Sequence, residues 1–335
     1  MSKENRSFSV VAICCVTAFL MLLAGCTKKS SAQTAPVDLK LDVKVPFQFV
    51  AYGDARFHNP NDHEASNPEV RITLVEAIAA ANPAFICMTG DLVYNGNDLE
   101  DWKVWDRETS IWREKSIPVY PSIGNHELHG GDAALVNFFQ RFPEIKSSRF
   151  YSVRAANILL LVLDSQLEET SGPQGDWLTS ELDHVPADVD FVFLMFHHPP
   201  YTSSSGDKMF GGTGHAARSK EIALAMRLEQ RQEKAPFRIV VFNGHVHNYE
   251  RHEHGGVIYF VSGGGGAHAY PIDRAPDDPF QSKGINYHYL LVQVDHRQLT
   301  ITMNRLEMSG GKTVWSQPDS VKIMAPVAAA QAAGR

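Results

Sequence analysis

Cysteine is scarce in this 335-residue chain, and the positions of its cysteines exclude a disulfide framework. Three of the four cysteines, Cys14, Cys15 and Cys26, lie in the first 26 residues. Cys87 alone remains, within the apolar run 85–88, and we interpret it as a small core residue. The fold must therefore depend on packing and bound ligands and not on cross-links.

Long runs of lysine and arginine are also missing, which argues against binding to a nucleic-acid duplex. The chain has 31 Lys and Arg against 38 Asp and Glu, a formal net charge of −7. Removal of residues 1–25 would take away Lys3, Arg6 and Glu4 and change this charge to −8. A mildly acidic protein lacks the positive surface that the phosphate backbone of a duplex attracts.

The N-terminal apolar run, Phe8–Ala24, is short for a membrane-spanning helix. It follows Lys3 and Arg6 and ends at Cys26, in a pattern that resembles the bacterial lipobox. We therefore expect residues 1–26 to be a lipoprotein signal peptide with Cys26 as the lipidated residue. The protein would then be exported to the bacterial cell envelope and anchored there by lipid, at the periplasmic face of a membrane or the cell surface. An uncleaved anchor is the alternative.

Five short polar blocks follow apolar runs that predict strands. The blocks are Gly53-Asp54, Gly90–Tyr94, Gly124–Glu127, His197–Tyr201 and Gly244–His247. The runs before them are Phe47–Tyr52, Phe85–Met88, Val119–Ile123, Phe191–Phe196 and Phe237–Phe242. Because strands that end together bring their loops together, we expect the carboxylate, amide, phenol and imidazole groups of these blocks to converge. Such ligands suit two metal ions about 3.5–4 Å apart.

Each block has a structural explanation when it is taken alone. Gly-Asp pairs are common in turns, and Gly124–Glu127 could cap a helix. Paired histidines such as His245 and His247 also occur for structural reasons. The joint occurrence of five blocks, each after a predicted strand, favours a hydrolytic site with two metals.

The order and the residues of the five blocks resemble the sequence motifs of the calcineurin-like metallophosphoesterase superfamily, and within it those of the purple acid phosphatase-like branch. Tyr94 stands where that branch carries a phenolate ligand to ferric iron, and residues 244–251 closely match a sequence motif of the same branch. The chain departs from the general superfamily pattern at Arg56, where a ligand histidine is usual, because a guanidinium has no lone pair for a metal. Arg56 could instead bind a substrate phosphate oxygen, or form a surface ion pair.

The resemblance implies a ligand set for two metals, of which one is iron and the other a divalent iron, zinc or manganese ion. The ligands would be Asp54, Tyr94 and His247 for the first metal, Asn125, His197 and His245 for the second, and Asp91 as the bridge. His197 matches the ligand position better than its neighbour His198. The resemblance also implies that His126 protonates the leaving alkoxide.

The fold that the resemblance implies is of the mixed α/β (α+β) class, a β-sandwich of mixed sheets flanked by helices. Residues 27–46 would be a flexible tether, 47–310 the catalytic domain, and 311–335 a C-terminal strand and tail. Helices are expected at about 68–82, 98–115, 131–142, 175–183 and 215–234. Pairs of antiparallel edge strands are expected at 150–164 and 286–304.

The implied function is a dinuclear-metal phosphoesterase, acid phosphatase-like, that hydrolyses small phosphate esters with a metal-bound hydroxide. One alternative is a phosphodiesterase or nucleotidase that uses manganese or zinc, since ligands identify a metal only loosely. The other is a surface lipoprotein that binds without turnover, which the complete ligand set argues against. Six further histidines are expected on solvated loops, at positions 58, 63, 129, 252, 254 and 268.

Overall fold

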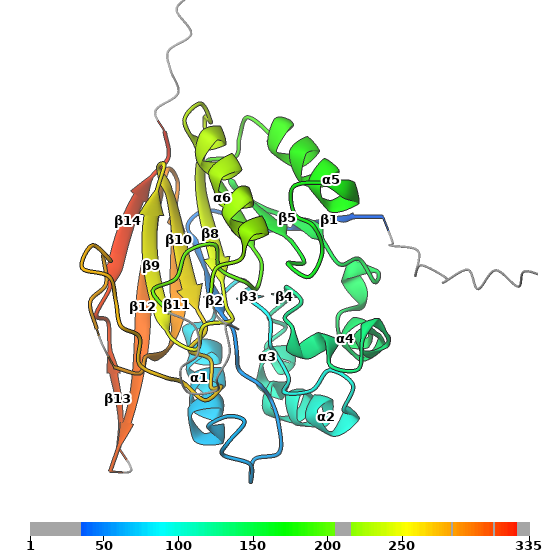
Figure 1. Ribbon diagram of the computed structural model, residues 1–335, viewed down its shortest axis with the longest axis vertical. Helices are drawn as coiled ribbons and strands as arrows, with labels where there is room; N and C mark the ends of the chain where they lie inside the picture. The colour runs from blue at the N-terminus through cyan, green and yellow to red at the C-terminus, as the bar shows by residue number, and fades with distance from the viewer. Residues whose placement is uncertain (1–34, 205–215, 283, 311, 327–335) are drawn as a thin grey trace, which may run out of the picture. The chain divides into compact units, whose positions relative to one another are not determined.

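Two mixed β-sheets pack face to face, with helices against their outer faces (Figure 1). The structure is a computed structural model that describes residues 35–204, 216–282, 284–310 and 312–326. The first sheet contains, in spatial order, β1 (Val37–Leu41), β5 (Tyr151–Ala155), β6 (Ile158–Val162), β7 (Phe191–Met195), β8 (Arg238–Asn243), β10 (Val257–Ser262) and β9 (Tyr249–His254). The second contains β13 (Lys312–Ser316), β12 (Gln298–Ser309), β11 (Tyr287–Asp295), β2 (Phe47–Tyr52), β3 (Ile86–Met88) and β4 (Val119–Pro121), with β14 (Ser320–Met324) also paired to β12.

The core between the sheets is built from alternate residues of the buried strands. Phe193 of β7 stacks on Phe242 of β8 with ring centroids 5.4 Å apart, and Phe49 of β2 meets Phe193 edge to face at 5.2 Å. These strands are apolar at almost every position because both of their faces are covered. Their neighbours in the sequence, such as Val192 and Val241, face the helices on the other side.

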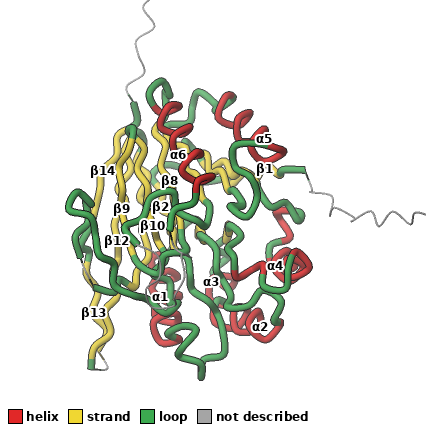
Figure 2. The backbone as a smooth tube through the Cα atoms, in the orientation of Figure 1, coloured by secondary structure: helices red, strands yellow, loops and turns green. Residues whose placement is uncertain are grey.

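Helices cover both outer faces of the sandwich (Figure 2). On the first sheet, α5 (Gly172–Asp183) and α6 (Ser219–Gln232) contribute Trp177, Leu178 and Leu228 to a second core. On the second sheet, α1 (Pro68–Ala81) contacts β11 and β12. The remaining helical segments are α2 (Leu99–Glu108), α3 (Ser110–Glu114), η1 (His126–Leu128), η2 (Asp132–Ala134), α4 (Leu135–Arg141) and η3 (Pro143–Ile145).

The bounds of α1 follow from its caps. The Asn67 side chain accepts a hydrogen bond from the Val70 N–H at 3.1 Å, and Pro68 occupies the first turn, where its missing N–H costs nothing. The helix ends at Asn82, which adopts the left-handed conformation with φ 49°. The sequence predicts both ends because Asn-Pro pairs flank an amphipathic segment.

The mixed α/β class is confirmed, but two expectations need correction: one domain boundary and the placement of two strand pairs in the sheets. The predicted tether at 27–46 is wrong in part, because residues 37–41 form β1 and pair in parallel with β5. The strand pairs at 150–164 and 286–304 are antiparallel, as expected, but they are not edges. β1 extends the sheet beyond the first pair, and β13 and β14 extend it beyond the second.

The predicted signal peptide at 1–26, including Cys26, lies outside the described residues, so export and lipid anchoring stay predictions. The end of the predicted tail, residues 327–335, lies outside them as well. Within the described ranges, no helix combines the length and the apolar character needed to cross a membrane.

Candidate metal centre

Parallel strands from both sheets bring the predicted ligands together. In the second sheet β2, β3 and β4 run parallel, and they lead into the loops of Asp54, Asp91 and Asn125. In the first sheet β7 and β8 are parallel and lead to His197 and His245. All of these loops leave the carboxyl ends of their strands, where loops commonly carry functional side chains.

Four of the predicted ligands form a tight group around His197. Its Nε2 lies 3.1 Å from Asn125 Oδ1, 3.2 Å from His245 Nδ1 and 3.3 Å from Asp91 Oδ1. Its Nδ1–H donates to the Thr89 carbonyl at 2.8 Å, so Nε2 carries a lone pair into the group. Oxygen and imidazole lone pairs that face one another in this way suit a cation, because all of them are potential ligands.

A second, wider group contains Asp54 and His247. His247 Nε2 lies 3.7 Å from Asp54 Oδ1, while its Nδ1–H donates to the His268 carbonyl at 2.8 Å and orients the ring. Both Asp54 oxygens accept from the His245 N–H, at 3.1 and 2.9 Å. Carboxylate oxygens of Asp54 and Asp91 and a ring nitrogen of His197 lie within 4.8 Å of one another, so the two groups are contiguous.

The charges of this region fit bound metal ions. Burial raises the pKa of Asp54 well above its ordinary value, and the Asp91 carboxylate raises it further. Burial also acts to raise the pKa of Asp91, but the charges of His197, His126 and Arg56 hold it well below the ordinary value. Two fully buried carboxylates this close together are stabilised by cations between them, which is what the predicted ligand set requires.

His126 is held so that its Nε2 faces the Asp91 carboxylate. Its Nδ1–H donates to the Tyr94 carbonyl at 2.5 Å, and its Nε2 lies 3.7 Å from Asp91 Oδ2. Its backbone N–H donates to Asp91 Oδ1 at 3.0 Å. Burial lowers the pKa of His126 to about 4, although Asp91 acts to raise it. A phosphate anion beside the ring would raise this pKa again.

Tyr94 lies beside the ligand groups, with an environment unlike that of the other predicted ligands. Its ring centroid is 4.8 Å from that of His58 and 5.5 Å from that of His126, and the residue is 37% exposed. Its hydroxyl makes no hydrogen bond with any residue that the structure describes. The phenolate role of Tyr94 therefore stays a prediction.

Arg56 forms a partly buried ion pair with Asp91, so the predicted alternative of a surface pair is wrong. Its Nη2 lies 3.3 Å from Asp91 Oδ2, and the two side chains are 16% and 0% exposed. The guanidinium thus lies directly against the carboxylate that is predicted to bridge the metals. Its predicted contact with substrate phosphate is not tested by this pair.

Glu127 is a site residue that the sequence analysis missed. Its carboxylate is fully buried and accepts four backbone N–H groups: those of Gly124 at 2.8 Å, Asp91 at 2.9 Å, Leu92 at 2.8 Å and Val93 at 3.3 Å. Burial raises the pKa of Glu127 to about 8, and these donors oppose that rise. The acid directly after His126 was the only signal in the sequence, because its partners are backbone groups.

Replacement of Glu127 with Gln should destabilise the protein and weaken metal binding. The amide nitrogen would face N–H groups that it cannot accept, which costs about 1–3 kcal/mol for each buried group left unpaired. Thermal unfolding and metal analysis on the same sample would measure both effects. Glu144→Gln, at an exposed position, is the control. An unchanged melting temperature with full metal content in Glu127→Gln would show that the carboxylate is dispensable.

Two of the six histidines expected on solvated loops are instead held by carboxylates. His58 Nδ1 pairs with Asp101 at 2.5 Å, and buried His252 lies 3.2 Å from Glu250. Four of the six are exposed as predicted, at positions 63, 129, 254 and 268. His198, the neighbour of the predicted ligand, is buried and bonds through Nδ1 with Ser165 Oγ at 2.8 Å.

The backbone is strained at four positions of the site. Asp54, Arg56, Asp91 and His245 have φ values of 57°, 46°, 51° and 71°, in the left-handed region that residues other than glycine rarely adopt. Such conformations cost about 1–3 kcal/mol each and persist only where the surrounding structure imposes them. Here the left-handed backbone conformation directs the side chains at these positions toward one another.

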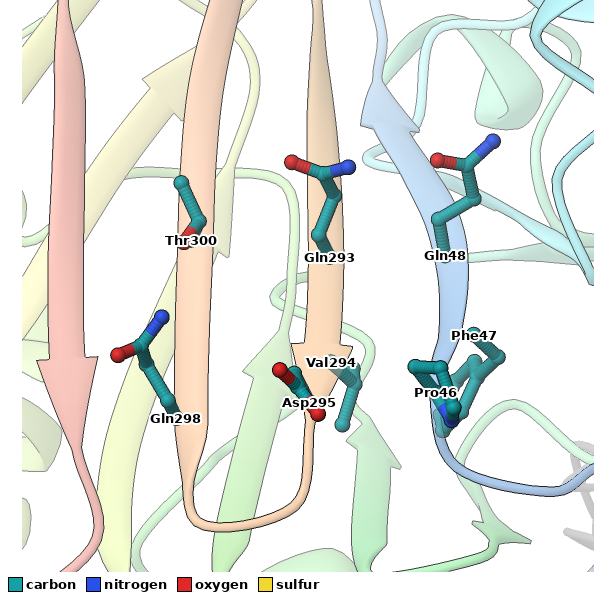
Figure 3. A pocket seen from close by; sticks show the side chains of 8 residues that line it. All are labelled: Pro46, Phe47, Gln48, Gln293, Val294, Asp295, Gln298 and Thr300. Atoms are coloured by element: carbon teal, nitrogen blue, oxygen red, sulfur yellow. The ribbon is translucent and has the colours of Figure 1, made fainter.

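A separate groove of about 430 Å³ lies on strands β2, β11 and β12 (Figure 3). It is lined by Pro46, Phe47, Gln48, Gln293, Val294, Asp295, Gln298 and Thr300. It meets β2 at the start of that strand, whereas Asp54 follows its end. The groove is therefore not part of the ligand groups.

The sequence model described as calcineurin-like phosphoesterase matches residues 57–249. The chain belongs to this family. Its curated relatives include purple acid phosphatases. Purple acid phosphatase 1 of Ipomoea batatas is 29% identical over 231 residues, an alignment that covers 62% of this chain and 44% of that protein. The Fe(3+)-Zn(2+) purple acid phosphatase 12 of Arabidopsis thaliana is 28% identical over 189 residues, 50% of this chain and 37% of that protein.

Solved structures share this fold. Purple acid phosphatase PPD1 from yellow lupin has a TM-score of 0.65 at 18% identity, over 85% of this chain and 55% of that chain. A dimetal phosphatase from Danio rerio has a TM-score of 0.56 at 13% identity, over 83% and 99%. This chain spans about half the length, or less, of the curated relatives that it matches. The predicted resemblance to the purple acid phosphatase-like branch is confirmed, and the fold with it.

Proposed function

We propose that this protein is a dinuclear-metal phosphoesterase that hydrolyses small phosphate esters. The observation that carries the proposal is the convergence of Asp91, Asn125, His197 and His245, whose ligand atoms lie 3.1–3.3 Å from His197 Nε2. Family membership and the purple acid phosphatase relatives support it. A hydrolase suits this constellation better than a binding module does, because the buried ligands are accompanied by the His126 imidazole, whose Nε2 faces Asp91.

Residues of this chain would hold two metal ions. Asp54 and His247 would bind the first, with Tyr94 as the predicted third ligand, and Asp91 would bridge to the second. The second would take Asn125, His197 and His245. Bound there, the ions would neutralise charge on the phosphate oxygens and lower the pKa of water from about 15.7 toward about 7.

The protein's own groups would orient the ester and handle the leaving-group proton. The Tyr94 carbonyl fixes the His126 ring, so that Nε2 is the atom that holds and delivers a proton. Glu127 fixes the loops that carry Asp91 and Asn125. Arg56 has N–H donors beyond the one directed at Asp91, and these suit a phosphate oxygen.

An assay of aryl phosphates with and without a chelator tests the function. The protein as purified should hydrolyse the ester, lose activity after metal removal, and regain it when metal is added back. Metal binding without hydrolysis of any monoester, diester or nucleotide would support the alternative of a non-catalytic binding lipoprotein. A strong preference for diesters or nucleotides would favour the phosphodiesterase or nucleotidase alternative.

Tyr94 decides between iron and a divalent pair. If the Tyr94 phenolate binds ferric iron, the purified protein should be coloured by ligand-to-metal charge transfer, and Tyr94→Phe should remove the colour. A trivalent ion is needed to hold a phenol deprotonated so far below its free pKa of about 10. The visible spectrum and metal analysis measure this. A colourless, active protein with two manganese or zinc ions, and no change in metal affinity in Tyr94→Phe, would disprove the iron–phenolate assignment alone.

A further inference from the structure

The glycine-rich loop that follows β10, residues 263–267, passes directly against the backbone of Asp54. The Gly265 N–H donates to the Gly53 carbonyl at 2.9 Å, and the Ala267 N–H donates to the Asp54 carbonyl at 2.8 Å. A Cβ on Gly265 would lie 2.2 Å from the Gly53 carbonyl oxygen, so a side chain here would collide with the backbone that it has to hold. The glycines therefore allow this loop to fix the backbone that carries Asp54.

The chain continues from this loop to His247, the other member of the group that contains Asp54. The His268 carbonyl accepts from His247 Nδ1–H at 2.8 Å, and the Tyr270 hydroxyl oxygen accepts from the His247 backbone N–H at 3.1 Å. The rings of Tyr270 and His247 have their centroids 5.5 Å apart. Asn248 Nδ2 donates to the Tyr270 carbonyl at 2.6 Å, so the residue after the ligand holds the tyrosine in turn. His247 is thus fixed both at its ring and at its backbone.

The hydroxyl and the ring of Tyr270 have separable contacts. The ring packs against a small apolar cluster around Ile272, a contact that phenylalanine would make equally well. The hydroxyl lies within range of the charges of the ligand group. Burial raises the pKa of Tyr270, the His247 N–H opposes this rise, and the Asp54 carboxylate adds to it. The hydroxyl therefore stays protonated and meets the His247 N–H as a neutral acceptor.

We propose that Tyr270 is a positioning residue for the reaction: its hydroxyl holds the His247 backbone so that His247 Nε2 stays directed at Asp54, 3.7 Å away, and at the metal that the two would bind. The inference rests on the proposed function, in which His247 is a metal ligand. Groups that orient a ligand histidine contribute about 10- to 100-fold to metal affinity or activity. His268 acts through its backbone carbonyl and Tyr270 through its side chain, so a substitution at Tyr270 isolates one of the two contacts.

Tyr270→Phe in the full chain tests the proposal, because it removes the hydroxyl and keeps the ring. The kcat for an aryl phosphate should fall about 10- to 100-fold, with KM within about threefold of its original value. During dialysis against a chelator, metal analysis should show one of the two ions released at least about tenfold faster and the other released at its original rate.

Tyr259→Phe is the matched control. Tyr259 is also buried, and its hydroxyl donates to Glu229 at 3.1 Å, but it belongs to neither ligand group. That variant should keep its kcat and both release rates. Hydrogen exchange in the metal-free chain measures the contact itself: the His247 backbone N–H should exchange at least about tenfold faster in Tyr270→Phe and at its original rate in Tyr259→Phe.

Several results would overturn the proposal. Unchanged kcat and unchanged release of both ions in Tyr270→Phe would do so, as would equal losses in Tyr259→Phe. If Tyr270→Phe does not fold, Asn248→Asp decides instead, because it removes the donor to the Tyr270 carbonyl, and normal kcat in that variant overturns the inference. In each of these cases chelator-sensitive hydrolysis by the unmodified protein would leave the phosphoesterase standing. Its absence for every ester would overturn the proposed function, and the inference with it.

Discussion

Asp91→Asn should abolish phosphatase activity and reduce the metal content at both sites. A neutral amide bridges two cations poorly, and both ligand groups meet at this side chain. The amide oxygen still accepts the His126 N–H that Asp91 Oδ1 accepts at 3.0 Å, so the loop should keep its shape. Turnover of an aryl phosphate and metal analysis on the same sample measure the two losses.

Asp319→Asn is the control for this substitution. Asp319 also forms an ion pair, with Arg251 at 2.8 Å, but it belongs to neither ligand group. That variant should keep its metals and its turnover. If Asp91→Asn retains two ions and near-normal turnover, the bridging assignment is wrong.

His126→Ala should retain both metals and lose about 10²–10⁴ in turnover, the usual contribution of a general acid. Its Nε2 lies 3.7 Å from Asp91 Oδ2, close to the reacting region, yet it belongs to neither ligand group. The loss should be smaller for nitrophenyl phosphate than for an alkyl phosphate, because a good leaving group needs less help from a proton. Steady-state rates for the two esters give the comparison.

The neighbouring His129 is the control for that variant. Its exposed ring lies 4.3 Å from the His126 ring by centroid, so His129→Ala tests for a general effect of losing an imidazole nearby. That variant should affect both esters little and equally. Equal losses for the two esters in His126→Ala itself would remove this residue from the leaving-group role.

The parts of the site that the sequence predicts are those set by local pattern. Asp54, Asp91 and His197 follow apolar runs within three residues, and those runs form buried strands whose ends meet. The two-sheet architecture followed from the family resemblance, since no local pattern specifies the order of strands. Both ends of α1 were predictable because an Asn-Pro pair stands at each of them: the Asn67 side chain caps the start, and Asn82 ends the helix in the left-handed conformation.

The parts that the sequence did not reveal depend on distant partners. β1 alternates apolar and polar residues over 37–41, but its parallel partner β5 lies more than a hundred residues away. Glu127 accepts hydrogen bonds from backbone N–H groups, and the positions of backbone groups cannot be predicted from the identity of the residues. The carboxylates that pair with His58 and His252 could not be predicted either, since both histidines lie in polar segments.

The left-handed conformation of Asp54, Asp91 and His245 creates a conflict between the stability of the protein and its catalytic function. Glycine adopts that conformation without strain, so a glycine at any of these positions would relieve a cost of about 1–3 kcal/mol while removing a ligand. In a related protein that no longer needed the hydrolytic activity, substitution of these ligands by glycine would therefore stabilise the fold. Glycine at these positions in a sequence of the same fold would therefore mark a descendant that has ceased to be an enzyme.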